Sequence, residues 1–328
     1  MARLRFYPDT RPGFSRRRAG RSFAFHEPDG TLIRDPEVRS RILAIGIPPA
    51  WRDVWISPYA NGHLQATGRD ARGRKQYRYH PDRMQSQAET KYASLAAFGE
   101  CLPALRRWID SRLRREAGER GFALGAVLAL IDASAIRVGN PAYTAENGSF
   151  GATTLQTSHL SLGESEVTLR FPGKGGKPVT QRLTGRKLAR VMHRLGDLPG
   201  ADLFVWIDEA GEPCSITSEE VNEAIRSVCG EGHSAKTFRT WNGTHAAFRH
   251  ALEAESITIR SLSEAAAERL HNTRTICRNS YIHPTVIALA QESNAARRAR
   301  LGALEPQPRA GLRPGEAELL AFLKQQPG

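Results

Sequence analysis

Long apolar stretches are absent from this sequence. No run approaches the roughly 18 consecutive apolar residues that a membrane-spanning helix needs. The first residues, Met-Ala-Arg-Leu-Arg-Phe, lack the apolar core of a signal peptide. These absences argue against a membrane-embedded or secreted protein, so we expect a cytoplasmic location and no membrane partner.

Cysteine is also scarce, and its spacing gives no sign of pairing. The four cysteines are Cys101, Cys214, Cys229 and Cys277, and no two of them form a CxxC motif. Disulfides are rare in the reducing compartment that the first residues suggest. We therefore expect that this protein contains no structural disulfide.

Lysine is also scarce, and so is tyrosine in the C-terminal half of the chain. Only 7 of the 47 basic residues are lysines. A lysine in a special backbone setting, such as Lys174 in Phe171-Pro-Gly-Lys-Gly-Gly-Lys177, therefore stands out. Six of the seven tyrosines precede residue 144, which leaves Tyr281 as the single phenol of the C-terminal half. Lys174 and Tyr281 are thus the first candidates for chemistry.

Positive charge is what the sequence has in excess. The formal net charge is +13 and the isoelectric point is about 10.1. Residues 1–90 hold 17 Lys and Arg against 9 Asp and Glu, a net of +8. A surplus of this kind indicates a polyanionic partner, and no segment has the apolar stripe of a basic membrane-surface helix. Nucleic acid is therefore the favoured partner, and solubility alone is the plainer alternative.

Sequence periodicity predicts an α+β protein with a small β-rich part and a larger helical part. Residues 1–22 are rich in Arg and Pro and predict a flexible basic arm. Residues 23–86 contain short strands, turn signals and one helix that begins at Asp35-Pro36-Glu37. Residues 87–328 are mainly helical, with a three-stranded sheet at about 152–183. The strands of that sheet are expected at Thr153–Thr157, Glu166–Phe171 and Pro178–Leu183.

The stretch Gly68-Arg-Asp-Ala-Arg-Gly-Arg-Lys-Gln-Tyr-Arg-Tyr-His80 is the best candidate for reading DNA. On a strand, Gln76 faces one side while Tyr77 and Tyr79 face the other. Gln can pair with adenine through two hydrogen bonds, and Arg74 can bind a phosphate or a guanine. The alternative interpretation is a solvated hairpin whose tyrosines belong to the core.

Two basic residues upstream of Tyr281 allow structural as well as chemical explanations. Arg137 follows an apolar helix over about 122–136, where an Arg can simply cap the helix carbonyls. Lys174 lies in a Gly-rich turn that resembles a phosphate loop only superficially, because the GxxxxGK[ST] spacing and the following helix are missing. The glycines make the turn mobile and allow close backbone approach.

Five residues together form the set needed to open a phosphodiester with a side-chain nucleophile. Tyr281 is the candidate nucleophile. Arg137 and Arg239 would neutralise the non-bridging oxygens, because Arg is always charged and offers paired donors. Asn272 would add a neutral donor. Lys174 would protonate the leaving oxygen, because the pKa of a Lys can fall near other cations.

Four stretches taken together resemble the poxvirus-type and bacterial type IB DNA topoisomerases, over roughly residues 20–300. Any one of these stretches alone is a weak signal. They are Ile47-Pro-Pro-Ala-Trp-Arg-Asp-Val-Trp-Ile56, Gly68-Arg-Asp-Ala-Arg-Gly-Arg74 with Gln76-Tyr77, Lys236-Thr-Phe-Arg239-Thr, and Asn272 to Tyr281.

The resemblance implies a DNA breaking-rejoining enzyme whose small β-rich domain and larger helical catalytic domain form a clamp on duplex DNA. It implies a 3′-phosphotyrosyl intermediate and relaxation of supercoils of both signs without ATP, metal or another cofactor. We also expect a monomer that associates with the nucleoid. The implied catalytic residues are Arg137, Lys174, Arg239, Asn272 and Tyr281. The expected DNA contacts are Arg74, Gln76, Tyr77, Tyr79, Tyr143 and Lys236.

The sequence departs from the poxvirus-type pattern at two places. Asn272 stands where that pattern has His, and His271 lies beside it. Asn can donate to a non-bridging oxygen but carries no charge, so we expect Asn272 to act with a modest effect when lost. A shift of one residue would give the role to His271. The second departure is Gly175 after Lys174, where the poxvirus-type loop is more polar.

Two other functions fit parts of the sequence. Tyrosine recombinases use much the same five residues, but they usually carry a His three residues before the second Arg, where this chain has Lys236. They also tend to have a helical N-terminal DNA-binding domain, whereas residues 23–80 predict strands. A non-catalytic DNA-binding protein would instead keep Tyr281 in its core and would leave no protein covalently bound to DNA.

Overall fold

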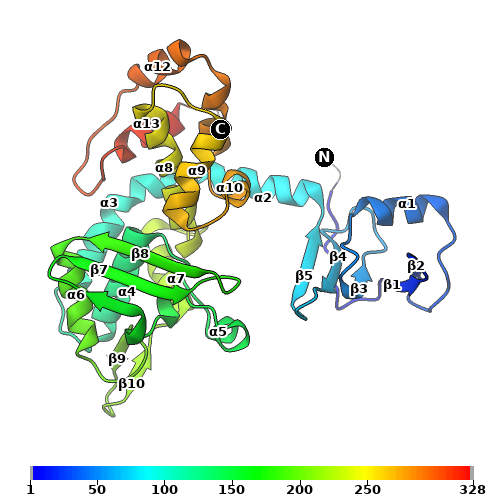
Figure 1. Ribbon diagram of the computed structural model, residues 1–328, viewed down its shortest axis with the longest axis horizontal. Coiled ribbons are helices and arrows are strands. Elements are labelled where there is room, and N and C mark those ends of the chain that lie inside the picture. The colour runs from blue at the N-terminus through cyan, green and yellow to red at the C-terminus, as the bar shows by residue number, and fades with distance from the viewer. Residues whose placement is uncertain (1–2, 326–328) are drawn as a thin grey trace. The chain divides into compact units, whose positions relative to one another are not determined.

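The computed structural model of this chain describes residues 3–325, except for the side chains of residues 87–88. The chain divides into two compact units, Met1–Lys91 and Tyr92–Gly328 (Figure 1). The division falls inside helix α2 (Pro81–Ala93), close to the boundary expected after residue 86. The outermost residues of the expected arm and catalytic domain, 1–2 and 326–328, lie outside the described residues.

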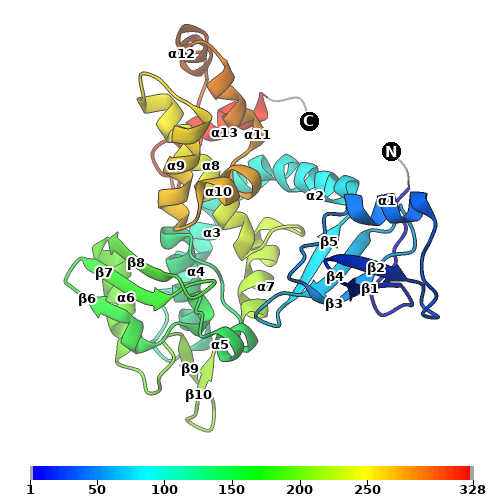
Figure 2. The ribbon, with the colours of Figure 1, turned by 45° about the vertical axis from the view of Figure 1, so that its right-hand side comes forward.

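A five-stranded antiparallel sheet with strand order β2-β1-β3-β4-β5 forms the N-terminal unit (Figure 2). Helix α1 (Pro36–Ala44) begins as predicted, because an Asp35 carboxylate oxygen accepts hydrogen bonds from the first free backbone N–H groups. The core contains Phe25, Ile42 and Ile56. The strands are β1 (Phe14–Ala19), β2 (Ser22–His26), β3 (Arg52–Ile56), β4 (Leu64–Arg69) and β5 (Lys75–Tyr79).

The expected flexible arm over residues 1–22 is wrong where the chain forms strand β1. Phe14 begins this strand, pairs with β3 and has a buried side chain. Arg16 donates a hydrogen bond to the backbone oxygen of Trp51 at 2.8 Å. The high charge misled the sequence interpretation, because arginines in a strand can place their guanidinium groups on backbone carbonyls while an apolar neighbour enters the core.

Helix α4 (Arg120–Ser134) is the centre of the C-terminal unit. Phe122, Val127 and Ile131 have 0% exposed surface, as expected of a helix that packs against other elements on all sides. No helix among the described residues is long and apolar enough to cross a membrane. The other helices of this unit are α3 (Leu95–Arg112), α5 (Pro141–Asn147), α6 (Arg186–Gly196), α7 (Ser218–Cys229), α8 (Ala235–Glu253), α9 (Ile259–Leu270), α10 (Arg274–Ser280), α11 (Pro284–Ala288), α12 (Asn294–Gly302) and α13 (Glu316–Lys324).

Two small antiparallel sheets complete the C-terminal unit. Strands β6 (Leu160–Leu162), β7 (Glu166–Pro172) and β8 (Pro178–Thr184) form the three-stranded sheet that the sequence predicts for this region. It contacts α4 and α6. Strands β9 (Val205–Ile207) and β10 (Pro213–Ser215) form a separate hairpin. This unit is largely helical and the N-terminal unit is β-rich, so the α+β organisation is confirmed.

The expected first strand of the three-stranded sheet, Thr153–Thr157, is wrong. Residues Ala152–Thr154 and Thr157–His159 form short 3-10 helices instead. The Thr153 hydroxyl donates a hydrogen bond to the backbone oxygen of Val138 at 3.0 Å. Threonine is common in strands, but its hydroxyl can also bond to backbone groups and stabilise an irregular conformation. Backbone bonds from Ala152 and Thr153 to the carbonyls of Arg137 and Val138 hold the same segment.

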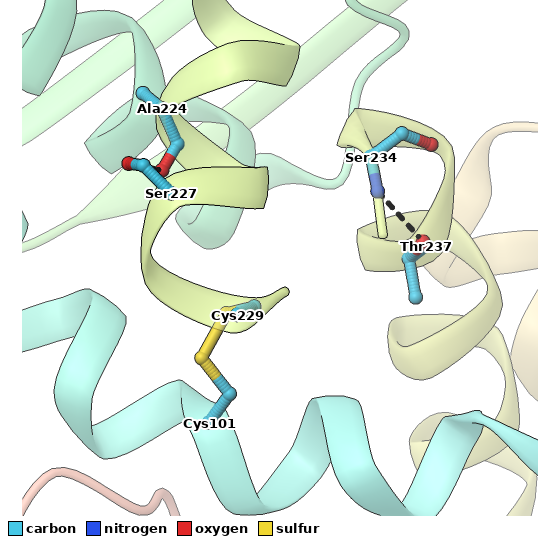
Figure 3. Close-up of a disulfide and its surroundings, with 6 residues drawn as sticks. All are labelled: Cys101, Ala224, Ser227, Cys229, Ser234 and Thr237. Atoms are coloured by element: carbon cyan, nitrogen blue, oxygen red, sulfur yellow. Dashed lines mark hydrogen bonds between the residues drawn. A yellow bond between two sulfur atoms is a disulfide. The ribbon is translucent and has the colours of Figure 1, made fainter. Parts of the chain in front are cut away.

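The expectation that the protein contains no structural disulfide is also wrong. Cys101 of α3 and Cys229 at the end of α7 form a disulfide, with Cα atoms 5.4 Å apart (Figure 3). The two residues are 128 positions apart, so no local spacing announces the pair, which depends on the packing of α3 against α7. Figure 3 shows the bridge near the start of α8, where the Ser234 N–H donates to the Thr237 hydroxyl at 3.1 Å.

Candidate active site

Arg239 of α8 lies in the interior of the C-terminal unit, with 3% of its surface exposed. Its Nη1 donates to the Ala135 carbonyl at 2.5 Å, and its Nη2 donates to the Leu270 carbonyl at 3.2 Å. The guanidinium carbon lies 5.0 Å from the centre of the Tyr281 ring. Among the described residues its buried Nε has no hydrogen-bond partner, which leaves one donor for an incoming anion.

Arg137 reaches the same place from the end of α4. The helix ends at Ala135, whose left-handed backbone (φ 55°) turns the chain. The N–H of Ala152 then fixes the segment by donating to the Arg137 carbonyl at 2.7 Å. Burial lowers the pKa of Arg137, and the charge of Arg239 lowers it further, so the two arginines are neighbours. Two cations held together in this way favour a bound anion.

The explanation of Arg137 as a helix cap is not supported. Within the described residues, its guanidinium makes no hydrogen bond to the carbonyls at the end of α4. Those carbonyls have other donors: the Ser134 oxygen accepts from the side-chain amide of Gln181 at 2.9 Å and the Ala135 oxygen accepts from Arg239. The half-buried Arg137 side chain therefore keeps its donors for another partner.

Tyr281 is a half-buried residue at the C-terminal end of α10. Its N–H donates to the Cys277 carbonyl at 2.8 Å. Burial raises the pKa of the phenol, but Arg239, Arg137 and Lys236 together lower it more, so the pKa lies below its ordinary value. A phenol beside three cations loses its proton more easily, which suits a nucleophile.

Two residues that the sequence analysis missed hold the Tyr281 backbone. The Thr244 hydroxyl donates to the Tyr281 carbonyl at 3.3 Å. At Gly243, an added Cβ would lie 2.6 Å from the same carbonyl oxygen and 3.1 Å from Tyr281 Cβ. The close approach of α8 to Tyr281 therefore requires glycine at this position. Helical spacing could have pointed to Gly243, because it lies one turn after Arg239 on the same helix face.

Both candidates for the polar residue follow the end of α9, and His271 is the one that lines the same pocket as the arginines. His271 is exposed and lines a small pocket together with Arg137 and Arg239. Asn272 is half-buried, and its Oδ1 accepts from the Thr273 N–H at 2.9 Å. Its Nδ2 is buried and finds no partner within residues 3–325. Buried donors are nearly always satisfied, so this one supports a site that an external acceptor completes.

Lys174 lies at the exposed tip of the β7–β8 hairpin. The N–H of Gly173 donates to the Lys177 carbonyl at 2.7 Å and closes the turn, and two glycines after Lys174 have left-handed φ values of 80° and 74°. In the described part of the chain Lys174 has no hydrogen-bond or ion-pair partner, and it is not among the charges that shift the pKa of Tyr281. The structure thus leaves Lys174 apart from the other candidates, although Gly173 lines the same small pocket as the two arginines.

The DNA-contact candidates of the N-terminal unit lie on the β4–β5 hairpin. Tyr77 and Tyr79 are 47% and 38% exposed, and their rings stack with centres 6.0 Å apart. The alternative that places these tyrosines in the core is therefore wrong. Arg74 Nε and Gln76 Nε2 donate to the Asp70 carboxylate at 2.9 and 3.0 Å. The hairpin thus presents two stacked aromatic rings, and it also carries an Arg and a Gln that Asp70 orients.

Tyr143 and Lys236 occupy exposed positions of the C-terminal unit. Tyr143 on α5 is 62% exposed, and α5 begins where Asn140 Oδ1 accepts from the Tyr143 N–H at 3.3 Å. Figures 1 and 2 show α5 on the same side of this unit as the tip of the β7–β8 hairpin. Lys236 lies in the first turn of α8 and is one of the cations that lower the pKa of Tyr281.

Two family models match the chain. The model described as bacterial DNA topoisomerase IB, N-terminal domain, matches residues 22–70. The model described as eukaryotic DNA topoisomerase I, catalytic core, matches residues 80–301, which is more than half of the chain. The second range includes all five candidate catalytic residues, and the first includes most of the N-terminal sheet.

Individual proteins that are named as DNA topoisomerases are also similar to this chain. DNA topoisomerase 1B of Acanthamoeba polyphaga mimivirus is 26% identical over 297 residues, which cover 86% of this chain and 88% of the viral protein. DNA topoisomerase 1B of Vaccinia virus (strain Copenhagen) and DNA topoisomerase I of Monkeypox virus are each 20% identical over 240 residues, 69% of this chain and 72% of each relative. With a catalytic-core model matched over most of its length, this chain belongs to the type IB DNA topoisomerases.

Proposed function

We propose that this topoisomerase relaxes positive and negative supercoils of double-stranded DNA by transient cleavage of one strand. The oxygen of Tyr281 bonds to the scissile phosphorus while the bond to the 5′ oxygen breaks, which gives a 3′-phosphotyrosyl ester and a free 5′-hydroxyl. The reverse attack by that hydroxyl reseals the strand. The ester keeps the bond energy, so resealing needs no ATP, and Arg137 and Arg239 neutralise the phosphate charge without a metal ion. The observation that carries this proposal is the Arg239 guanidinium 5.0 Å from the Tyr281 ring, with Arg137 beside it.

The other candidate catalytic residues neutralise charge on the phosphate or protonate the leaving oxygen. Arg137 and Arg239 neutralise the charge that grows on the non-bridging oxygens, and the buried Nδ2 of Asn272 adds a neutral donor. Lys174 protonates the leaving 5′ oxygen. Because Lys174 lies on a mobile Gly-rich tip and has no partner among the described residues, it reaches that oxygen when DNA is bound.

Six residues of the two units are proposed to bind the duplex. Tyr77, Tyr79, Arg74 and Gln76 contact it from the N-terminal unit, where their side chains are displayed on one hairpin. Tyr143 and Lys236 contact phosphates near the cleavage site. The two units then act as a clamp, and a monomer with a net charge of +13 associates with the nucleoid through counterion release.

Plasmid relaxation in EDTA without ATP tests the proposed function, with an SDS stop that traps protein covalently bound to DNA. We expect wild-type protein to relax plasmids of either sign and to leave a trapped adduct on the 3′ side of the break. A protein that shifts the plasmid in a gel, but neither relaxes it nor forms an adduct, would be a DNA binder. That outcome would remove the catalytic assignments.

Gly243→Ala is expected to slow cleavage by about 100-fold, because its methyl group displaces the nucleophile by a fraction of an ångström or more. Single-turnover adduct formation on a duplex oligonucleotide measures the effect. Gly302→Ala is the matched control, since a Cβ at Gly302 meets nothing within 4 Å. Equal rates for the two variants would show that the close approach of α8 to Tyr281 does not position it.

The choice between Asn272 and His271 can be tested with the same assay. Asn272→Ala should slow cleavage by about tenfold, the effect of one neutral donor to a charged oxygen. His271→Ala should cleave at nearly the wild-type rate, and Asn272→His should recover most of the loss. A larger effect at His271 than at Asn272 would assign the role to the histidine.

A further inference from the structure

Arg269 lies in the last turn of α9 and has no part in the chemistry proposed above. Its Nη1 donates to the Ser134 carbonyl at 3.2 Å, and its Nη2 donates to the Ala133 carbonyl at 2.8 Å. The same Nη2 donates to Oδ1 of Asn242 at 2.7 Å. Ala133 and Ser134 end α4, and Asn242 belongs to α8. One guanidinium thus joins three helices.

The joined segments are those that orient Arg239. Its two acceptors are the carbonyls of Ala135 and Leu270. Ala135 directly follows Ser134, whose carbonyl Arg269 binds, and Leu270 directly follows Arg269 itself. Displacing the Arg269 guanidinium would therefore disturb both acceptors of Arg239 at once.

The same connection extends to two more residues of the site. Arg137 lies two positions after Ala135, in the segment that leaves α4, and Asn272 lies three positions after Arg269, just beyond the end of α9. These two residues also have backbone hydrogen bonds of their own, to Ala152 at 2.7 Å and to Ala267 at 3.0 Å. Arg239 is therefore the candidate that depends most directly on Arg269. Tyr281 is connected less directly, through Gly243 and Thr244, which follow Asn242 in α8 and hold the Tyr281 backbone.

The charges around Arg269 indicate that it acts through geometry. Its three acceptors are neutral, and the nearby Asp132 carboxylate is already bound by Arg106 and Arg313 at 2.9 and 2.7 Å. Burial lowers the pKa of Arg269, as do the charges of Arg313 and Arg239. Arg269 therefore repels Arg239 electrostatically. What it supplies is a rigid planar fork that fixes several acceptors together, which Lys cannot reproduce.

We propose that Arg269 is a positioning residue of the cleavage reaction, which holds the two backbone carbonyls that orient Arg239 toward the scissile phosphate. This inference rests on the proposed function. It differs from a purely structural role, because the effect of Arg269 on the reaction passes through Arg239. It predicts a defect in the cleavage step rather than in DNA binding, since the Arg269 donors are occupied inside the protein.

Arg269→Met tests the proposal, since it removes the fork and keeps an apolar stem. We expect single-turnover adduct formation to slow by about 10- to 100-fold, as misplacement of a charged group near the phosphate implies. DNA affinity, measured by filter binding, should remain that of the wild type. The cleavage rate of Arg269→Lys should lie between the rates of the wild type and of Arg269→Met. Arg260→Met is the matched control, because Arg260 is an exposed arginine of the same helix with no partner among the described residues.

The same substitution in an Arg239→Ala background separates positioning from a general structural effect. With Arg239 absent, Arg269→Met should slow cleavage by less than about threefold more, because the group that it orients is missing. Equal slowing in both backgrounds, or wild-type cleavage by Arg269→Met, would overturn the proposal. If thermal unfolding shows that Arg269→Met does not fold, Arg269→Lys takes its place in the same cycle. Failure of wild-type protein to form any adduct would refute the proposed function itself.

Discussion

Tyr281→Phe is expected to abolish the covalent protein–DNA adduct and plasmid relaxation, with a rate loss of at least about 10⁴-fold. The substitution removes the one oxygen that can bond to phosphorus and leaves the ring in place beside Arg239. The phenol loses its proton more readily than an ordinary tyrosine, because nearby cations outweigh the effect of burial on its pKa. Gel separation after an SDS stop measures the adduct directly, and filter binding should show unchanged DNA affinity.

Tyr92→Phe is the matched control for that experiment. Tyr92 belongs to the same unit and is also buried, but burial raises its pKa to about 12, so it has none of the activation found at Tyr281. Tyr92→Phe should form the adduct at close to the wild-type rate. Persistent adduct with Tyr281→Phe would reveal a different nucleophile, and loss of adduct with both variants would indicate general damage.

The sequence predicted those parts of the fold that local interactions determine. Asp35 and Pro36 predicted the start of α1, which is confirmed. The β-rich and helical halves follow from periodicity in the same way. For the site, residue chemistry and chain order predicted one set, and the structure brings Arg137, Arg239 and Tyr281 together. The roles of these residues stay predictions.

The parts that the sequence did not predict depend on contacts between distant segments. Strand β1 is highly charged, and only its pairing with β2 and β3 stabilises an extended conformation there. The bridge between Cys101 and Cys229 needs α3 and α7 side by side. In the sequence alone, Arg269 looks like an ordinary helix arginine. Gly243 looks like a glycine that is unfavourable in a helix. Their importance is visible only when α4, α8, α9 and Tyr281 are placed against one another.

Lys174→Ala is expected to slow cleavage of an ordinary phosphodiester by about 10²- to 10⁴-fold, the usual contribution of a general acid. The 5′ oxygen is a poor leaving group unless it gains a proton as its bond to phosphorus breaks. A sulfur in the same bridging position leaves readily as a thiolate, because the pKa of a thiol is only about 8.5. On that substrate the Lys174→Ala variant should cleave within about tenfold of the wild type.

Lys177→Ala distinguishes this specific role from a loss of charge in the turn. Lys177 lies in the same exposed hairpin turn, three residues later, and its replacement removes the same charge while its carbonyl still accepts the Gly173 N–H that closes the turn. It should cleave both substrates at nearly the wild-type rate. If Lys174→Ala stays slow on the sulfur substrate, the lysine does not protonate the leaving group. Its effect would then resemble that of Arg137 and Arg239, which act on the non-bridging oxygens and give no such recovery, because those oxygens carry the same charge in both substrates.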